Sequence, residues 1–244
     1  MQKMPFTDFL VMSLLAGNIA LFFITPSSST LFSSFSLLAI AAFAVLEFWG
    51  IAKKEKPSFT NFWFLLFIGG LFWVAGDTMR LLGVKALVTI PLYFMVYLFA
   101  VAAFLIYIGG LLQGKRLVYA FAPGIVSGVF SIFLFGAVLA PVALSPSLGI
   151  LEKVVGIGFP LVNVALVFLS LFVFQSNLKK RGGGAKPYLL AAEAFLVLAS
   201  AELLYMGAMF GRLSIGIIPL LDIAFLFGYF LLFSAARERS RAIA

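Results

Sequence analysis

The sequence predicts an all-α polytopic membrane protein, a bundle of about eight transmembrane helices. Three observations lead to this prediction. Hydrophobic residues make up 64% of the 244 residues and charged residues only 11%, whereas a soluble domain is nearer half apolar and a quarter charged. The mean hydropathy is +1.17. The apolar residues also form runs of about 20, the length of a helix that crosses a bilayer.

These runs predict helices and not a barrel, because the strict alternation of transmembrane strands is absent. Backbone groups inside a bilayer must be hydrogen-bonded within their own segment. No polar tract is long enough for a soluble domain, so residues 1–244 form one transmembrane domain. The expected transmembrane spans, in chain order, are 7–25, 31–52, 61–82, 87–111, 116–140, 150–175, 187–211 and 215–236. Each span has a basic residue at or near one of its ends: in the same order these are Lys3, Lys53, Arg80, Lys115, Arg116, Lys179, Lys186 and Arg237.

The basic residues predict the orientation of the chain. Thirteen of the 17 Lys and Arg residues lie at the two termini and in every second connection. The positive-inside rule then places both termini in the cytoplasm. The net charge of +8 accordingly indicates topology and attraction to anionic lipids, and no nucleic-acid partner is expected. Residues 1–25 also fit a signal peptide, but their apolar run is long for a signal core, which favours a retained helix.

The absent residue types limit the chemistry. There is no Cys and no His, which excludes disulfides, thiolate nucleophiles and the metal and haem sites that use these side chains. No metal and no cofactor are expected. Acid–base chemistry has to use Asp, Glu, Lys, Tyr or water.

The two halves of the chain resemble each other. The stretches beginning at Asp77 and at Glu202 both run from an acid through Gly and a lone basic residue to Ile-Pro-Leu and an aromatic-rich helix, so that Pro91 matches Pro219. This favours a four-plus-four repeat of equal orientation, with halves 1–114 and 115–244, as seen in some transporters. Chance matching remains the alternative in so apolar a chain.

Carboxylates inside apolar runs are costly and are functional candidates. Asp77 lies about two-thirds along the third expected span, Glu202 at comparable depth in the seventh, and Asp222 in the first turns of the eighth. Three carboxylates at similar depth can converge in one pocket. Simpler roles remain open, because Asp77 can pair with Arg80 three residues later and Asp222 stands near a helix N-terminus, where acids are favoured.

Tyrosines occur near these carboxylates. Tyr93, Tyr97 and Tyr107 repeat along the fourth span and can line a pocket, although such a stripe more often serves packing. Tyr205 follows Glu202 by about one turn. The expected site therefore consists of Asp77 and Glu202 as catalytic residues, with Arg80, Asp222, Tyr93, Tyr97, Tyr107 and Tyr205 as ligand-binding residues.

Two further acids lie toward the cytoplasmic ends of their spans. Glu47 precedes Lys53 and Lys54 by about two turns, and Glu193 follows Lys186 by the same distance. Ion pairs with these long basic side chains at the interface are expected.

Small residues mark close helix contacts. Gly124 and Gly128 stand four apart in the fifth span, as do Gly207 and Gly211 in the seventh. Such spacing lets helix backbones approach closely. The contacts can lie within one chain or between copies in a homo-oligomer.

The chain resembles the YhhN family of eight-helix membrane proteins, which includes lysoplasmalogenases, hydrolases of vinyl-ether lysolipids. The resemblance lies in the helix count, in the Gly76–Asp77 pair of "GLFWVAGDTMRLLG", and in "AFLVLASAELLYMGAMF", where Glu202 takes the place of the family aspartate. The third family motif, Ala-His-x-x-Tyr, corresponds to Ala103, Phe104 and Tyr107. Phe104 thus replaces the family histidine.

The resemblance implies membrane lipids as ligands, either bound or cleaved. Asp77 and Glu202 would act as general base and acid around a bound water. The residues equally fit a proton- or cation-coupled transporter of small solutes. A sensor that signals through a partner on its basic loops is the third alternative.

Overall fold

The structure is a computed structural model that describes residues 6–24, 29–84, 86–112, 121–146, 149–178, 184–209 and 213–243. All regular secondary structure in this part of the chain is helical. The elements are α1 (Phe6–Ile24), α2 (Ser29–Lys54), α3 (Phe62–Leu81), α4 (Ala86–Leu112), α5 (Phe121–Leu134), the π-helix η2 (Phe135–Leu139), α6 (Ala140–Leu144), α7 (Ile150–Leu178), α8 (Lys186–Met209), the 3₁₀-helix η3 (Ile215–Ile217) and α9 (Ile218–Ala242).

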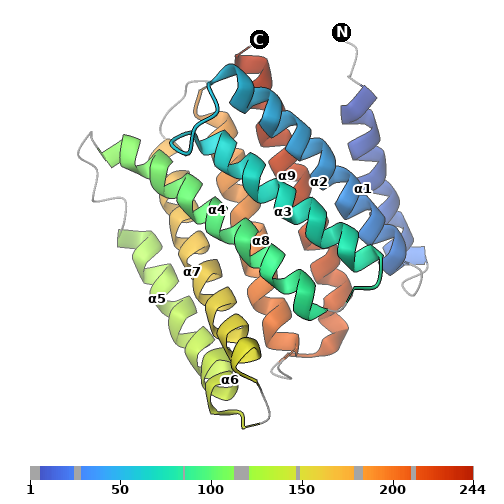
Figure 1. Ribbon diagram of the computed structural model, residues 1–244, viewed down its shortest axis with the longest axis vertical. Helices are drawn as coiled ribbons and strands as arrows, with labels where there is room; N and C mark the ends of the chain where they lie inside the picture. Colours follow the sequence, from blue (N-terminus) through green and yellow to red (C-terminus); the bar gives the residue numbers. More distant parts are fainter. Residues whose placement is uncertain are drawn as a thin grey trace.

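Within these residues, seven helices are long and apolar enough to cross a membrane: α1, α2, α3, α4, α7, α8 and α9. The prediction of an all-α polytopic bundle is therefore confirmed. The start of α1 and the end of α9 lie at the same end of the bundle (Figure 1), which is called the terminal end below. The opposite end, where α3 ends and α4 begins, is called the distal end.

The fifth expected span, 116–140, differs in detail. Its helical turns run from Phe121 to Leu144 without a break, but η2 interrupts the α-helical hydrogen bonding near the middle. Pro141 explains the interruption, because it lacks a backbone N–H and its ring crowds the carbonyl one turn earlier. The wider turn of a π-helix accommodates this crowding. The continuous run is about 36 Å long, enough to cross a bilayer, and residues 113–120 lie outside the described residues.

The last span is longer than expected. It was predicted to end at 236, but α9 continues to Ala242. Its three arginines are paired with acids at the terminal end. Arg237 donates to Asp8 of α1 at 2.9 Å and to Glu47 of α2 at 2.8 Å. The remaining contacts of this ion-pair network are Arg239–Glu55 at 2.6 Å, Arg241–Asp8 at 2.9 Å, Arg241–Glu238 at 3.6 Å and Lys186–Glu238 at 3.2 Å.

Two ion-pair predictions were therefore wrong in their partners. Glu47 pairs with Arg237 and accepts a hydrogen bond from Ser240 at 2.8 Å, while Lys186 pairs with Glu238 instead of Glu193. The true partners come from helices that are distant in the sequence.

The long helices form a ring. In order around it, α2 packs on α3, α3 on α4, α4 on α7, α7 on α8, α8 on α9, and α9 again on α2. Outside the ring, α1 packs on α2 and α9, and α5 packs on α7. The neighbours of the first four spans thus recur in the last four, as a repeat of equal orientation would produce. Duplication of the sequence itself stays a prediction.

Glycines permit the closest contacts in the ring. A Cβ on Gly228 of α9 would lie 2.5 Å from Leu198 of α8, and a Cβ on Gly70 of α3 would overlap Val45 of α2. Of the glycine pairs predicted from the sequence, Gly124 and Gly128 face open space. Pairing of two copies through α5 stays a prediction, and Gly211 lies outside the described residues.

Candidate functional site

Asp77 is the most deeply buried carboxylate of the expected site, with only 1% of its surface exposed. The hydroxyl of Tyr93, on α4, donates to its Oδ1 at 2.6 Å. The hydroxyl of Tyr229, on α9, donates to its Oδ2 at 3.4 Å. Arg80 Nη2 lies 3.8 Å from Oδ1. One carboxylate therefore joins three helices of the ring.

The local sequence explains how Tyr93 reaches Asp77. A Cβ on Gly76 would lie 3.1 Å from the Tyr93 ring carbons Cε1 and Cζ, closer than side chains normally pack. Glycine at this position lets the ring lie across α3, so that its hydroxyl reaches the next residue. At the other end of α3, the Asn61 side chain accepts hydrogen bonds from the backbone N–H groups of Trp63 and Phe64, a cap that fixes where the helix begins.

Arg80 is the basic group of the site. Its side chain is 44% exposed, and Nη2 lies 3.5 Å from Ser34 Oγ of α2. Arg80 also interacts electrostatically with Asp222 and Glu202. A single guanidinium thus lies within range of all three carboxylates.

Glu202 and Asp222 are both half-buried. Over the part of the chain that the structure describes, neither makes a hydrogen bond or an ion pair, and no hydrogen bond joins Asp77 to Glu202. Tyr97 of α4 interacts electrostatically with both Glu202 and Asp77, and Tyr205 with both Glu202 and Asp222. The carboxylates therefore share one region without touching.

Direct contacts or electrostatic interactions link all but one of the residues expected from the sequence. The exception is Tyr107, which lies at the terminal end, where its hydroxyl donates to Asn177 Oδ1 at 3.1 Å and its ring stacks on Tyr188 at 4.1 Å. Tyr107 follows Tyr93 by 14 residues, which is about 21 Å along a helix. We call the group at the distal end the distal cluster: Asp77, Arg80, Tyr93, Tyr97, Glu202, Tyr205, Asp222 and Tyr229.

Sequence reasoning missed two aromatic residues of this region, Tyr229 and Trp73. Their rings meet edge to face with centroids 4.1 Å apart. A signal for both was present, because Trp73 precedes Asp77 by one helical turn and Tyr229 follows Asp222 by two. Aromatic residues make up 16% of the chain, however, so spacing alone did not distinguish these two.

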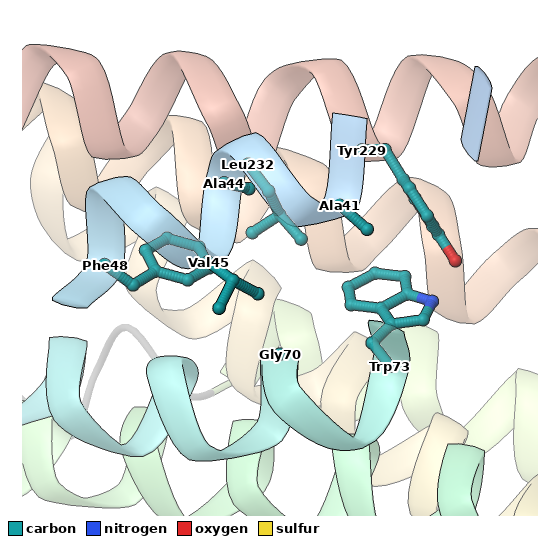
Figure 2. Close-up of a pocket in the computed structure, with 8 residues that line it drawn as sticks. All are labelled: Ala41, Ala44, Val45, Phe48, Gly70, Trp73, Tyr229 and Leu232. Carbon is teal, nitrogen blue, oxygen red and sulfur yellow. The ribbon is translucent and has the colours of Figure 1, made fainter. Parts of the chain in front are cut away.

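A small apolar pocket lies between α2, α3 and α9 (Figure 2). Trp73 and Tyr229 lie side by side at one end of it, and none of the three carboxylates lines it. Its lining residues are Ala41, Ala44, Val45, Phe48, Gly70, Trp73, Tyr229 and Leu232. The aromatic pair therefore stands between an apolar hollow and Asp77.

The described residues contain no group of three or more acids that could hold a metal ion. Comparisons of the chain with known protein families, curated proteins and solved structures find no match.

Proposed function

We propose that this membrane protein binds a lipid-derived ligand at the distal cluster and that Asp77 and Glu202 act on it as an acid–base pair. The observation that carries the proposal is the contrast between these two carboxylates. Asp77 is 1% exposed and accepts hydrogen bonds from Tyr93 and Tyr229. Glu202 makes no such contact with any described residue. Two carboxylates in unlike surroundings are suited to opposite proton-transfer roles.

The chemistry follows the resemblance to the vinyl-ether lysolipid hydrolases. Glu202 gives its proton to the alkene carbon of the vinyl ether, and water adds to the cation so formed while Asp77 accepts the proton that the water loses. The resulting hemiacetal breaks into an aldehyde and an alcohol. Phe104, at the position of the family histidine, packs between the rings of Phe62 and Phe195 at 5.5 Å from each, so no proton carrier stands there.

The charges of the cluster suit a zwitterionic head group. The partly exposed guanidinium of Arg80 can bind a phosphate, and the carboxylates of Asp222 and Glu202, which contact no basic side chain among the described residues, can bind an ammonium group. A lysolipid with a phosphate and an amine satisfies both, while its chain stays in the bilayer.

Native mass spectrometry of the purified protein tests this proposal. We expect one lipid class to stay bound to the natural protein and to be lost in Asp77→Asn and Glu202→Gln. Tyr107→Phe is the matched control, because this tyrosine lies on the same helix as Tyr93 but outside the distal cluster. Equal lipid occupancy in all four proteins would refute the site. Incubation with a vinyl-ether lysolipid then shows whether aldehyde is released or the lipid is only held.

Proton- or cation-coupled transport is the second candidate. It is favoured by the recurrence of helix contacts in the two halves, with α4 meeting α7 as α9 meets α2, because several transporter folds consist of such repeats. Uptake of a labelled solute into proteoliposomes, driven by a proton gradient, would distinguish transport from hydrolysis.

A further inference from the structure

Helix α7 carries buried polar side chains on the face that packs against α4. Asn163, Ser170 and Asn177 are all 0% exposed. They are spaced by seven residues, or about two turns, so they share one face. Their neighbours show where this face points: the Phe159 ring, one turn before Asn163, meets Tyr97 of α4 at 5.3 Å. We call Asn163, Ser170 and Asn177 the polar stripe of α7.

Two atoms of this stripe lack hydrogen-bond partners among the described residues, namely Asn163 Oδ1 and Ser170 Oγ. The amide nitrogen of Asn163 donates to the Phe159 carbonyl at 3.1 Å, so its oxygen is left to face the surrounding side chains. Buried polar atoms are almost always paired, with protein or with ordered water. Two unpaired atoms on one buried face of α7 therefore point to bound water.

The distal end of the stripe lies beside the distal cluster. Asn163 is one turn from Phe159, whose ring meets that of Tyr97 at 5.3 Å. Asn163 lies 15 residues before the end of α7 at Leu178, and Glu202 lies 16 residues after the start of α8 at Lys186, so both stand at the same depth on two helices that pack together. The titratable groups that interact with Tyr97 are Glu202, Asp77 and Tyr93.

The other end of the stripe continues to the terminal end of the bundle. Asn177 Oδ1 accepts a hydrogen bond from Tyr107 at 3.1 Å, and the Tyr107 ring stacks on Tyr188. The guanidinium of Arg239 lies 5.8 Å above the Tyr188 ring and is bound to Glu55 at 2.6 Å. Polar groups thus follow one another from the distal cluster to the terminal end.

We propose that the polar stripe of α7 holds a file of water molecules that carries protons between Glu202 and the terminal end of the bundle. Successive stripe residues are about 10 Å apart along the helix, a gap that roughly three hydrogen-bonded waters can span. Each water accepts one proton and passes one on. Glu202 loses one proton to the file and regains one from the distal side, so one proton moves across in balance.

This inference goes beyond the proposed lipid chemistry, since it concerns α7 and does not depend on which ligand the distal cluster binds. It explains why Asn163 Oδ1 and Ser170 Oγ are buried on one face of α7 without a partner among the described residues. It also gives Glu202 a proton supply on the side away from the distal end.

Proton flux into proteoliposomes tests the proposal, with a pH-sensitive dye inside and an imposed pH gradient whose charge is compensated by potassium and valinomycin. We expect flux above that of protein-free liposomes, and a fall of about tenfold or more in Asn163→Leu and Ser170→Val. Ser176→Val is the matched control, because Ser176 is also a buried α7 serine with an unpaired hydroxyl but lies on another face of the helix. Absence of flux in the natural protein, or an equal loss in Ser176→Val, would overturn the proposal.

A stability measurement keeps the proposal testable if the larger substitutions misfold. Removing a hydroxyl that is truly unpaired should raise the Tm, whereas removing one that binds water should lower it. We expect Ser170→Ala to lower the Tm, and a higher Tm than that of the natural protein would contradict water at this position.

Discussion

At the residue scale, Gly76 and Asp77 together determine the position of Tyr93, although only Asp77 is hydrogen-bonded to it. The glycine leaves room for the Tyr93 ring, and the ring places its hydroxyl 2.6 Å from the aspartate. A helix interior normally disfavours glycine. Glycine is needed here for packing. A larger side chain at this position would move the Tyr93 ring and so disturb its hydrogen bond to Asp77.

Gly76→Ala is therefore expected to destabilise the protein by about 1–3 kcal/mol, the usual cost of overpacking. The new methyl group has to displace the Tyr93 ring, which loosens the hydrogen bond to Asp77. Thermal unfolding in detergent measures the effect. Gly124→Ala is the control, because a Cβ there meets nothing within 4 Å, and equal unfolding of the two variants would contradict this packing.

Tyr93→Phe removes the shortest hydrogen bond to Asp77. We expect a loss of about 1–3 kcal/mol, since a buried carboxylate oxygen is left without its donor. Adding Asp77→Asn should cost much less in the Tyr93→Phe background than in the natural protein, because the two groups form one interaction. A double-mutant cycle on unfolding free energies measures this coupling, and strict additivity would show that the two groups do not interact.

The sequence was sufficient to find the carboxylates of the distal cluster but not their partners. Asp77, Glu202 and Asp222 are conspicuous because an ionisable side chain in an apolar run is expensive. Tyr229 was not found, because its contact with Asp77 depends on how α9 is rotated against α3. Tyr107 lies far from Tyr93, because helical spacing identifies a shared face but not a shared depth.

At the scale of elements, the ends of helices were predicted less well than their existence. The eighth span was expected to end at 236 because Arg237 would be costly in a bilayer. Its partners, Asp8 and Glu47, lie on α1 and α2, and nothing near Arg237 in the sequence indicates them. Pairing between distant segments thus extends α9 by a turn and a half.

Arg237→Gln is expected to destabilise the bundle by about 3 kcal/mol, because it leaves the partly buried Glu47 without a cation and removes one of the two arginines paired with Asp8. The substitution should loosen α1 and α2 from the end of α9. Arg241→Gln is the control, since the Arg241 side chain is 55% exposed and exposed pairs contribute about 1 kcal/mol or less. Thermal unfolding of both variants provides the comparison, and an equal effect would argue against a structural role for Arg237.

At the scale of the whole molecule, the ring of helices determines where the site lies. The two halves of the chain have the same order of helix neighbours, and they meet where α2 packs on α9 and where α4 packs on α7. The residues of the distal cluster come from α3, α4, α8 and α9. Apolar runs were enough to predict a bundle, because hydrophobicity and length determine membrane spans. The closure of the ring was not predictable, since apolar helices carry little information about which neighbours they prefer.

The orientation of this ring in the membrane is a prediction from the basic residues and can be measured directly. The chain has no cysteine, so one introduced thiol reports on one position alone. Phe59 lies in the connection between α2 and α3, at the terminal end, and is 67% exposed; Leu82 directly follows α3, at the distal end, and is 76% exposed. If the termini are cytoplasmic, a membrane-impermeant maleimide should label Leu82→Cys in intact cells and Phe59→Cys only after permeabilisation. The reverse pattern would place the distal cluster on the cytoplasmic side and would reverse the direction in which the polar stripe of α7 supplies protons to Glu202.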